Sequence, residues 1–273
     1  MKKIMTLAAI FAAVMMGISS CNPDDTKPEQ KPDTEQPGDE TPGEGEGEQT
    51  PGEGEGEGEG EGEGEVPAAA ITIDGDFADW DALEGAQVAT LPEGDVKYEQ
   101  LKTFKLYADE EFIYIFCEFD PENTLVFVPY FDLDGDPTTG NASKWTGAGY
   151  EAKAEGAIFE ELEGPAQGAA QPWDPTFYYY GESTDEVLAA GVAVTSSTPA
   201  EYKDGNWAFE ASILREVLLE AYAAVFEGTA TETFTMGMIQ YDLNWGYIGQ
   251  LPCKTLEQAD AGETEPMLTV TLP

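Results

Sequence analysis

The pattern of apolar and polar residues divides the chain into three parts. A short apolar run from Met5 to Ile18 follows two lysines, a stretch with almost no apolar residues extends to residue 66, and short apolar segments separated by Gly, Pro and Asp fill residues 67–273. In the third part, residues 101–109 alternate between two faces, and the EFIYIFCEFD sequence that follows is a β-branched and aromatic run. Both patterns are typical of strands, and the Asp109-Glu110 step predicts a tight hairpin between them.

The same criteria predict further strands and one helix. The strands cover residues 122–134, 150–162, 176–181, 190–197, 205–213, 233–242 and 265–272. The helix covers residues 214–225, where apolar residues recur at helical spacing, with Ser212 as its N-cap and Gly228 beyond its end. Many short strands with turn residues between them, together with one short helix, predict an all-β domain. We expect an antiparallel β-sandwich with jelly-roll or immunoglobulin-like layers.

The N-terminal 20 residues have the layout of a secretory signal peptide. Their apolar core is shorter than the roughly 20 residues that a membrane span needs, and the small residues Ser19 and Ser20 precede Cys21. The run from Ile18 to Cys21 resembles the lipobox of bacterial lipoproteins, which implies that Cys21 is lipidated and becomes the first residue of the mature chain. The alternative is an ordinary signal peptide with an incidental cysteine. The lipoprotein is favoured because Cys21 falls where the cleavage site should lie.

The composition of residues 21–66 predicts an unfolded acidic linker. The segment is rich in proline and then repeats Gly-Glu from Gly52 to Glu65. Glycine loses the most entropy on ordering, like charges repel, and almost nothing apolar is available for burial. The CNPDD sequence at its start resembles the export tag that sends Bacteroidetes lipoproteins to the outer cell surface. We therefore expect an outer-membrane protein, anchored by lipid and exposed at the cell surface, with one domain covering residues 67–273.

Charge and composition exclude several functions. The chain has 55 acidic residues, 12 basic residues and no histidine, so His-based nucleophile relays and His-ligated zinc or haem are ruled out. Residues 22–65 contain 17 of the acids, and four of the lysines precede residue 67. The remaining domain therefore has 38 acids and 8 bases, a net charge near −30. This charge argues against nucleic acid, anionic lipid headgroups and polyanionic glycans as partners. It favours divalent cations and neutral or cationic partners.

Four segments resemble domains related to family 9 carbohydrate-binding modules, which share the DOMON-like β-sandwich. The matched sequences are ITIDGDFADWDAL, EFIYIFCEFD after Asp109, FDLDGDPTTGN followed by GAGYEAK, and DGNWAFEASILREVL, in the order that the family has them. The resemblance implies a β-sandwich that binds glycans, with Trp80 packed into the core beside a structural turn. The carboxyl end departs from the family because it offers no convincing pair of sugar-sandwiching tryptophans.

The PYFDLDGDPTTG sequence at residues 129–140 raises the question of a metal site. It places Asp132, Asp134 and Asp136 at alternate positions, with glycines that let the chain fold around an ion. Calcium takes six to eight oxygen ligands, and the spacing is not that of an EF-hand. The alternative is a strand end followed by an Asx-type turn. We expect no required cofactor and keep calcium at these three aspartates as a hypothesis to test.

Four aromatic residues are the candidate ligand-binding residues. Trp145, Trp173, Trp245 and Tyr247 lie among small, polar or proline residues rather than in alternating strands, so their rings are available to stack on the C–H faces of sugars. The alternative is that they cap the ends of the sandwich core, where we place Trp80 and Trp207. No motif singles out one acid as a proton donor, so the pattern predicts a protein that is not an enzyme.

Two functions follow from these patterns. The first is a glycan-binding surface protein that captures a neutral polysaccharide or oligosaccharide for neighbouring enzymes or a transporter. The second is a structural or protein-interaction lipoprotein without a sugar site. In either case Cys117 and Cys253 are expected to be free, buried thiols, although a disulfide between them would stabilise the fold by about 3–5 kcal/mol in the chain-entropy model.

Overall fold

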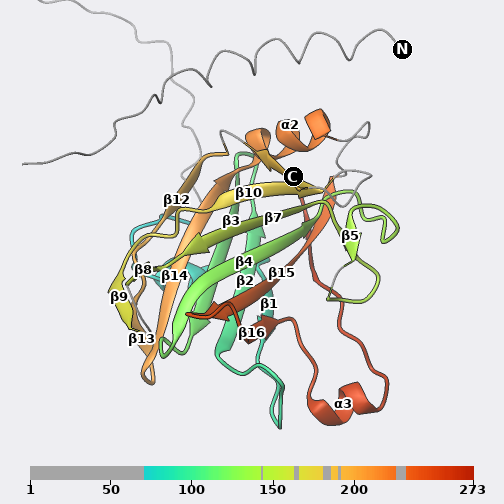
Figure 1. Cartoon of the computed structure of the whole chain (residues 1–273). Helices are drawn as coiled ribbons and strands as arrows, with labels where there is room; N and C mark the ends of the chain where they lie inside the picture. Colours follow the sequence, from blue (N-terminus) through green and yellow to red (C-terminus); the bar gives the residue numbers. More distant parts are fainter. Residues whose placement is uncertain (1–70, 143, 163–165, 181–185, 190–191, 226–231) are drawn as a thin grey trace, which may run out of the picture. The chain divides into compact units, whose positions relative to one another are not determined.

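A computed structural model of the whole chain describes residues 71–142, 144–162, 166–180, 186–189, 192–225 and 232–273. The predicted signal peptide, Cys21 and the acidic linker lie outside the described residues, as do Gly181, Ala190, Gly191 and Gly228. The described residues form two main antiparallel sheets that pack face to face (Figure 1). In this part of the chain, no helix combines the length and the apolar character that a membrane crossing requires.

The first sheet contains six strands in the order β1-β2-β3-β14-β12, with β13 also paired to β14. Its strands are β1 (Gln87–Thr90), β2 (Leu101–Ala108), β3 (Phe112–Phe119), β12 (Val194–Ser196), β13 (Ala200–Lys203) and β14 (Asn206–Leu214). The predicted hairpin joins β2 to β3, with Leu106 opposite Ile115. Its turn is held by the Asp109 carboxylate, whose Oδ1 accepts from the backbone N–H groups of Glu111 and Phe112.

The second sheet contains seven strands in the order β11-β10-β7-β4-β15-β16, with β17 also paired to β15. Its strands are β4 (Thr124–Asp132), β7 (Ala152–Ala157), β10 (Thr176–Tyr180), β11 (Glu186–Ala189), β15 (Thr233–Asp242), β16 (Tyr247–Leu251) and β17 (Leu268–Thr271). Two small hairpins complete the described strands: β5 (Asn141–Ala142) pairs with β6 (Gly149–Tyr150), and β8 (Phe159–Glu161) with β9 (Gln167–Ala170).

These sheets confirm the predicted antiparallel β-sandwich. The predicted strand at 150–162 is divided among β6, β7 and β8, and β1, β5, β9, β11, β13 and β16 were not predicted. Helix α2 (Arg215–Val225) forms where the helix was predicted and lies next to β10 and β14 at one end of the sandwich (Figure 1). The Ser212 N-cap prediction was wrong, because Ser212 belongs to β14 and pairs with Tyr114 and Thr195.

Two more short helices lie in the described residues besides α2, so the expectation of a single helix was too low. Helix α1 (Ala78–Ala82) carries Trp80, which is buried as expected. The indole N–H of Trp80 donates to the buried carboxylate of Glu210, 2.9 Å away, and the same carboxylate accepts from the backbone N–H groups of Asp74 and Gly75. Helix α3 (Leu256–Asp260) begins at Thr255, which forms a capping box with Gln258.

The main core lies between the two sheets. Phe127 from the second sheet meets Phe119 and Phe209 from the first, each with a ring-centroid distance of 5.0 Å in an edge-to-face arrangement. Cys117 is buried in this core, and Cys253 is half-buried beside it. The two cysteines are free, as expected, although Cys253 is less buried than predicted. Burial raises the pKa of both thiols, that of Cys253 to about 11.

Strand β4 is buried on both of its faces. Phe127 and Phe131 point into the main core, whereas Val128 and Tyr130 belong to a second apolar cluster on the opposite face of the sheet. Residues of β15, the partner of β4, also contribute to this second cluster, and Trp145 and Met267 pack against it. Because the outer face of the β4–β15 pair is apolar, the segments that carry Trp145 and Met267 are needed to keep it from water.

Candidate functional site

The turn between β15 and β16 is held by the side chain of Asp242. Its Oδ1 accepts hydrogen bonds from the backbone N–H groups of Asn244, at 2.7 Å, and Gly246, at 2.8 Å. The backbone N–H of Trp245 donates to the Asp242 carbonyl at 3.0 Å. Such aspartate-capped turns are set by local hydrogen bonds, so this one does not depend on burial of its own side chains.

Trp245 occupies an unusual position in that turn. Its φ is +61°, a left-handed backbone conformation that glycine or asparagine adopts more readily, and its side chain is 53% exposed. A residue other than glycine in this region costs about 1 kcal/mol or more, and such strain tends to gather at functional sites. An exposed indole held by strained backbone marks this turn as a candidate binding surface.

Three tyrosines extend the surface beside Trp245. The ring centroid of Tyr241 lies 5.7 Å from that of Trp245 and 4.8 Å from that of Tyr247, and Tyr247 lies 5.8 Å from Tyr98. We call these four residues the aromatic platform. Tyr241 is its buried base, and its hydroxyl lies 3.0 Å from the hydroxyl of Tyr130. Tyr98 and Tyr247 are half-buried, so the platform presents parts of three rings to solvent.

Tyr98 reaches the platform because the segment before β2 lies along β16. Glu99 forms an isolated bridge with Gly249, and the backbone N–H of Gln100 donates to the Ile248 carbonyl at 3.0 Å. Sequence analysis missed Tyr98 because its surroundings, DVKYEQ, carry no strand pattern. Only the pairing with β16, about 150 residues further along the chain, brings it to the site.

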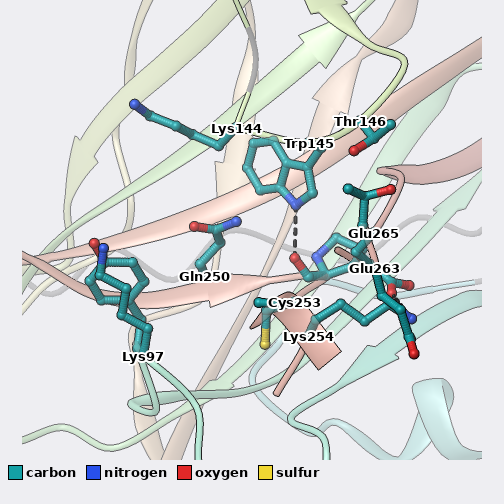
Figure 2. Close-up of a pocket in the computed structure, with 13 residues that line it drawn as sticks. Lys97, Lys144, Trp145, Thr146, Gln250, Cys253, Lys254, Glu263 and Glu265 are labelled. Carbon is teal, nitrogen blue, oxygen red and sulfur yellow. Dashed lines mark hydrogen bonds and ion pairs between the residues drawn. The ribbon is translucent and has the colours of Figure 1, made fainter. Parts of the chain in front are cut away.

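A pocket of about 230 Å³ adjoins the platform (Figure 2). Its walls include Lys97, Tyr98, Lys144, Trp145, Gln250 and Lys254. The pocket is smaller than the roughly 300–1,000 Å³ of sites that enclose drug-sized ligands. It therefore suits one ring or substituent of a ligand whose remainder lies across the platform.

The structure separates the four predicted aromatic residues into two pairs. Trp245 and Tyr247 lie together in the platform. Trp145 is 4% exposed: it packs over Gly237 and its indole N–H donates to the Pro252 carbonyl at 2.8 Å (Figure 2). Trp173 is 1% exposed, packs over Gly156 and donates to the Phe127 carbonyl at 3.3 Å.

Burial corrects the prediction for Trp145 and Trp173, because neither indole has an open face for a sugar. Trp145 is nevertheless one of the residues that line the pocket. Both tryptophans instead cover the apolar core, which was the alternative interpretation of the sequence. Trp207, assigned to the core, is half-buried in β14 and contacts Phe159 with a centroid distance of 5.8 Å.

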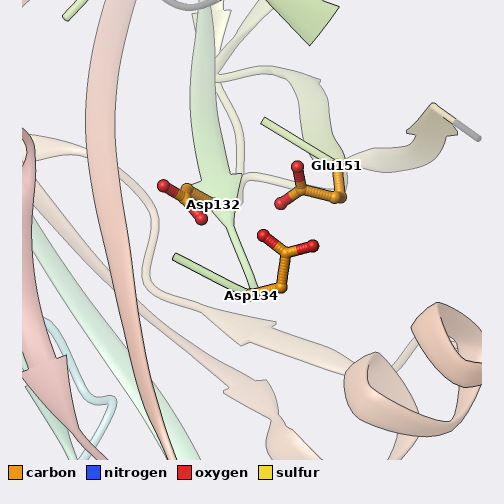
Figure 3. Close-up of side chains that lie close together, drawn as sticks. All are labelled: Asp132, Asp134 and Glu151. Atoms are coloured by element: carbon orange, nitrogen blue, oxygen red, sulfur yellow. The ribbon is translucent and has the colours of Figure 1, made fainter. Parts of the chain in front are cut away.

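The acidic loop after β4 forms a cluster of three carboxylates with a different membership from the predicted one (Figure 3). Asp132, Asp134 and Glu151 each place a carboxylate oxygen within 4.8 Å of the others. Asp136 is outside this cluster, because its exposed carboxylate accepts from the backbone N–H and hydroxyl of Thr138. Glu151 was missed by sequence analysis: it lies between β6 and β7, next to Ala152, which pairs with Phe131 at the end of β4.

Donors within the fold surround this carboxylate cluster. The backbone N–H of Leu133 donates to Glu151 at 2.8 Å, that of Gly135 to Asp132 at 2.6 Å, and the hydroxyl of Thr139 to Asp134 at 3.0 Å. Burial raises the pKa of Glu151 to about 7, and the neighbouring charges of Asp134 and Asp132 act in the same direction. Burial also raises the pKa of Asp132. The cluster therefore either keeps a proton near neutral pH or requires a cation when fully ionised.

No family model matches this chain, and no curated protein matches its sequence. Among solved structures, a family 9 carbohydrate-binding module from Caldicellulosiruptor kristjanssonii, in complex with cellotriose, matches with 12% identity and a TM-score of 0.34. The match covers 74% of this chain and 89% of the module. At this identity and score, the likeness transfers neither a ligand nor a site to this chain.

Substitution of Glu151 by glutamine should flatten the dependence of stability on pH. Between the ordinary glutamate pKa of 4.5 and the folded-state pKa of about 7, the folded chain keeps a proton that the unfolded chain has released. The contribution of Glu151 to the free energy of unfolding is therefore fully present below pH 4.5, and it falls as the pH rises from 4.5 to about 7. In the presence of a chelator, the wild type should lose more free energy of unfolding than Glu151→Gln between about pH 5 and about pH 8.

Chemical unfolding of both proteins at several pH values measures this difference. Repulsion among the other acidic residues acts on both proteins and cancels in the comparison. Equal slopes of stability against pH would show that Glu151 is ionised throughout the range.

Proposed function

We propose that the domain binds a glycan, without catalysis, at the aromatic platform. The observation that carries the proposal is Trp245, a half-exposed indole in strained backbone that contacts Tyr241, which in turn contacts Tyr247. Sugar C–H faces stack on aromatic rings, and the polar side chain of Gln250 lies in the adjacent pocket, where an amide can pair with hydroxyls. Rigid rings on a turn that Asp242 holds in place need little ordering on binding.

The ligand class proposed is a neutral polysaccharide or oligosaccharide. The net charge near −30 of residues 67–273 disfavours nucleic acid and densely charged glycans. An open platform with a small pocket accommodates a chain of sugars better than one enclosed small molecule. The biological role in this proposal is capture of the glycan for neighbouring enzymes or a transporter.

A second candidate function is protein interaction. Exposed tryptophan and tyrosine residues are also typical centres of protein–protein interfaces, and the same platform offers them. The sandwich alone does not decide between the two, since one fold hosts many functions. Glycan binding is preferred because the platform borders a pocket that is lined by Gln250 and by lysines, groups that pair with sugar oxygens.

We place the domain at the cell surface on a lipid anchor as part of the same proposal. Its support is the sequence from Ile18 to Cys21 and the acidic segment that follows.

Protease added to intact cells should release the domain, and mass analysis of the mature N-terminus should find acyl chains on Cys21. A domain that survives until the envelope is broken would contradict the surface location. An unmodified Cys21 would contradict the anchor.

Calcium at the carboxylate cluster is a further part of the proposal. Asp132, Asp134 and Glu151 supply hard oxygen ligands, and a cation there would stabilise the ionised Glu151 carboxylate, whose pKa is raised by burial and further by the charges of Asp134 and Asp132. The hydroxyl of Thr139, which donates to Asp134 and lies 3.2 Å from Glu151, is a further oxygen beside them. The ion would stabilise the loop after β4 rather than contact the glycan.

Calcium should raise the melting temperature by several degrees near pH 8 and by less near pH 5, where protons compete for the carboxylates. Binding to the folded state alone adds about 2.7 kcal/mol at a hundredfold excess over Kd. Glu151→Gln should lose this response, while Asp136→Asn, a matched change outside the cluster, should keep it. Equal melting temperatures with calcium and with chelator would contradict the calcium site and show that the loop is a turn without a metal ion.

Replacement of Trp245 by asparagine should separate binding from stability. Asparagine tolerates the left-handed conformation, so the variant should melt at or above the wild-type temperature. Loss of the exposed ring should weaken glycan binding at least tenfold, the range of a central interface residue. A glycan array followed by calorimetry on the domain measures both effects.

The matched control is Trp207→Phe, a half-buried tryptophan of β14, away from the platform, which should leave binding unchanged. Wild-type protein that binds no glycan on the array, or a Trp245→Asn variant that binds as well as wild type, would contradict the proposed site.

A further inference from the structure

The few basic residues of the domain are unevenly distributed. Residues 67–273 contain eight, and three of these, Lys97, Lys144 and Lys254, line the pocket beside the platform. For a surface with a net charge near −30, this is a local concentration of positive charge. The remaining bases include Lys105, Lys153 and Lys203, each of which forms an ion pair with an acid near it.

The pocket has a neutralised end and a cationic end. Lys254 forms a 2.6 Å ion pair with Glu265, and Glu263 also raises the pKa of Lys254. Among the described residues, Lys97 and Lys144 have no carboxylate within ion-pairing distance. Figure 2 shows both of them on the opposite side of Gln250 from Lys254 and Glu265.

The two unpaired lysines lie against the rings of the platform. The Nζ of Lys97 is 4.9 Å from the Tyr98 ring centroid, and that of Lys144 is 5.7 Å from the Tyr247 ring centroid. Tyr98 and Tyr247 are themselves in edge-to-face contact, so each ammonium group lies against one ring of a touching pair. The ring contacts restrain the lysines beside the surface on which a sugar would stack.

We propose that the cationic end of the pocket recognises a carboxylate on the glycan. The ligand would be a largely neutral glycan that carries isolated uronic acid residues, with the acid group between Lys97 and Lys144 and a hydroxyl on Gln250. This inference rests on the proposed glycan-binding function and changes its ligand class from a wholly neutral glycan to one with isolated carboxylates.

Distance reconciles this preference with the acidity of the domain. Salt screens exposed charges beyond about 10 Å at 0.1 M ionic strength, so distant acids act weakly on a bound carboxylate. An ammonium group in direct contact with the carboxylate acts strongly on it, because charge-assisted hydrogen bonds are roughly twice as strong as neutral ones. A glycan with a carboxylate on every residue would instead place several of its charges against the acidic surface.

The test uses immobilised uronate-bearing oligosaccharides of several backbones, each beside its carboxyl-reduced, neutral counterpart. The wild-type domain should bind the acid form of at least one backbone about tenfold more tightly than the neutral form. The Lys97→Gln/Lys144→Gln double variant should bind both forms alike, at the affinity of the wild type for the neutral form. Lys203→Gln, the same change of charge on β13, should keep the preference, and Trp245→Asn should weaken binding of both forms.

The outcomes distinguish this inference from the function on which it rests. Equal wild-type affinity for acid and neutral forms, or a preference that survives in the double variant, would overturn the carboxylate site and leave glycan binding intact. Failure of the wild type to bind either form of any backbone would overturn the proposed function, and the carboxylate site with it.

Discussion

The β4–β15 pair is apolar on both faces, and the rest of the molecule is arranged around that constraint. The inner face is covered by the first sheet, as in any sandwich, whereas the outer face needs a separate cover. Trp145 supplies much of it, and it approaches closely because Gly237 of β15 has no side chain. The same indole then forms a wall of the pocket, and Tyr241, on that outer face, carries the rings of the platform. The candidate site is therefore an extension of the apolar layer that shields the outer face of the second sheet from water.

Local patterns identified the sandwich but not its edges. Strands such as β2 and β3 alternate or run apolar within a few residues, so their sequence alone indicates them. β16 has glycine at its centre, and its pairing with β15 is interrupted between Gln240 and Tyr241, so it carries no comparable signal. Its absence from the predicted set also hid the contact that brings Tyr98 to Tyr247.

The tryptophans show where sequence reasoning stops. Trp145, Trp173 and Trp245 have similar small and polar neighbours, yet only Trp245 is exposed. The difference lies in glycines on other strands: Gly237 and Gly156 receive the first two indoles, while Trp245 projects from a turn that Asp242 holds. Glu151 joined Asp132 for the same reason, because strand register decides which distant residues meet. Non-local pairing, rather than residue type, determined these outcomes.

The Asp242 turn has a consequence for how this surface can change over time. One carboxylate accepts its hydrogen bonds from backbone N–H groups, which every residue except proline possesses, and the side chains of Asn244 and Trp245 are exposed. Substitution of Asn244 by any residue except proline, or of Trp245 by a residue that accepts its left-handed backbone, leaves the hydrogen bonds of the turn and the packing of the sheets in place. The domain thus combines a closely packed scaffold with a short exposed segment whose side chains can vary within that backbone constraint. That combination allows the chemistry of this exposed surface to change by single mutations, without passing through an unfolded intermediate sequence.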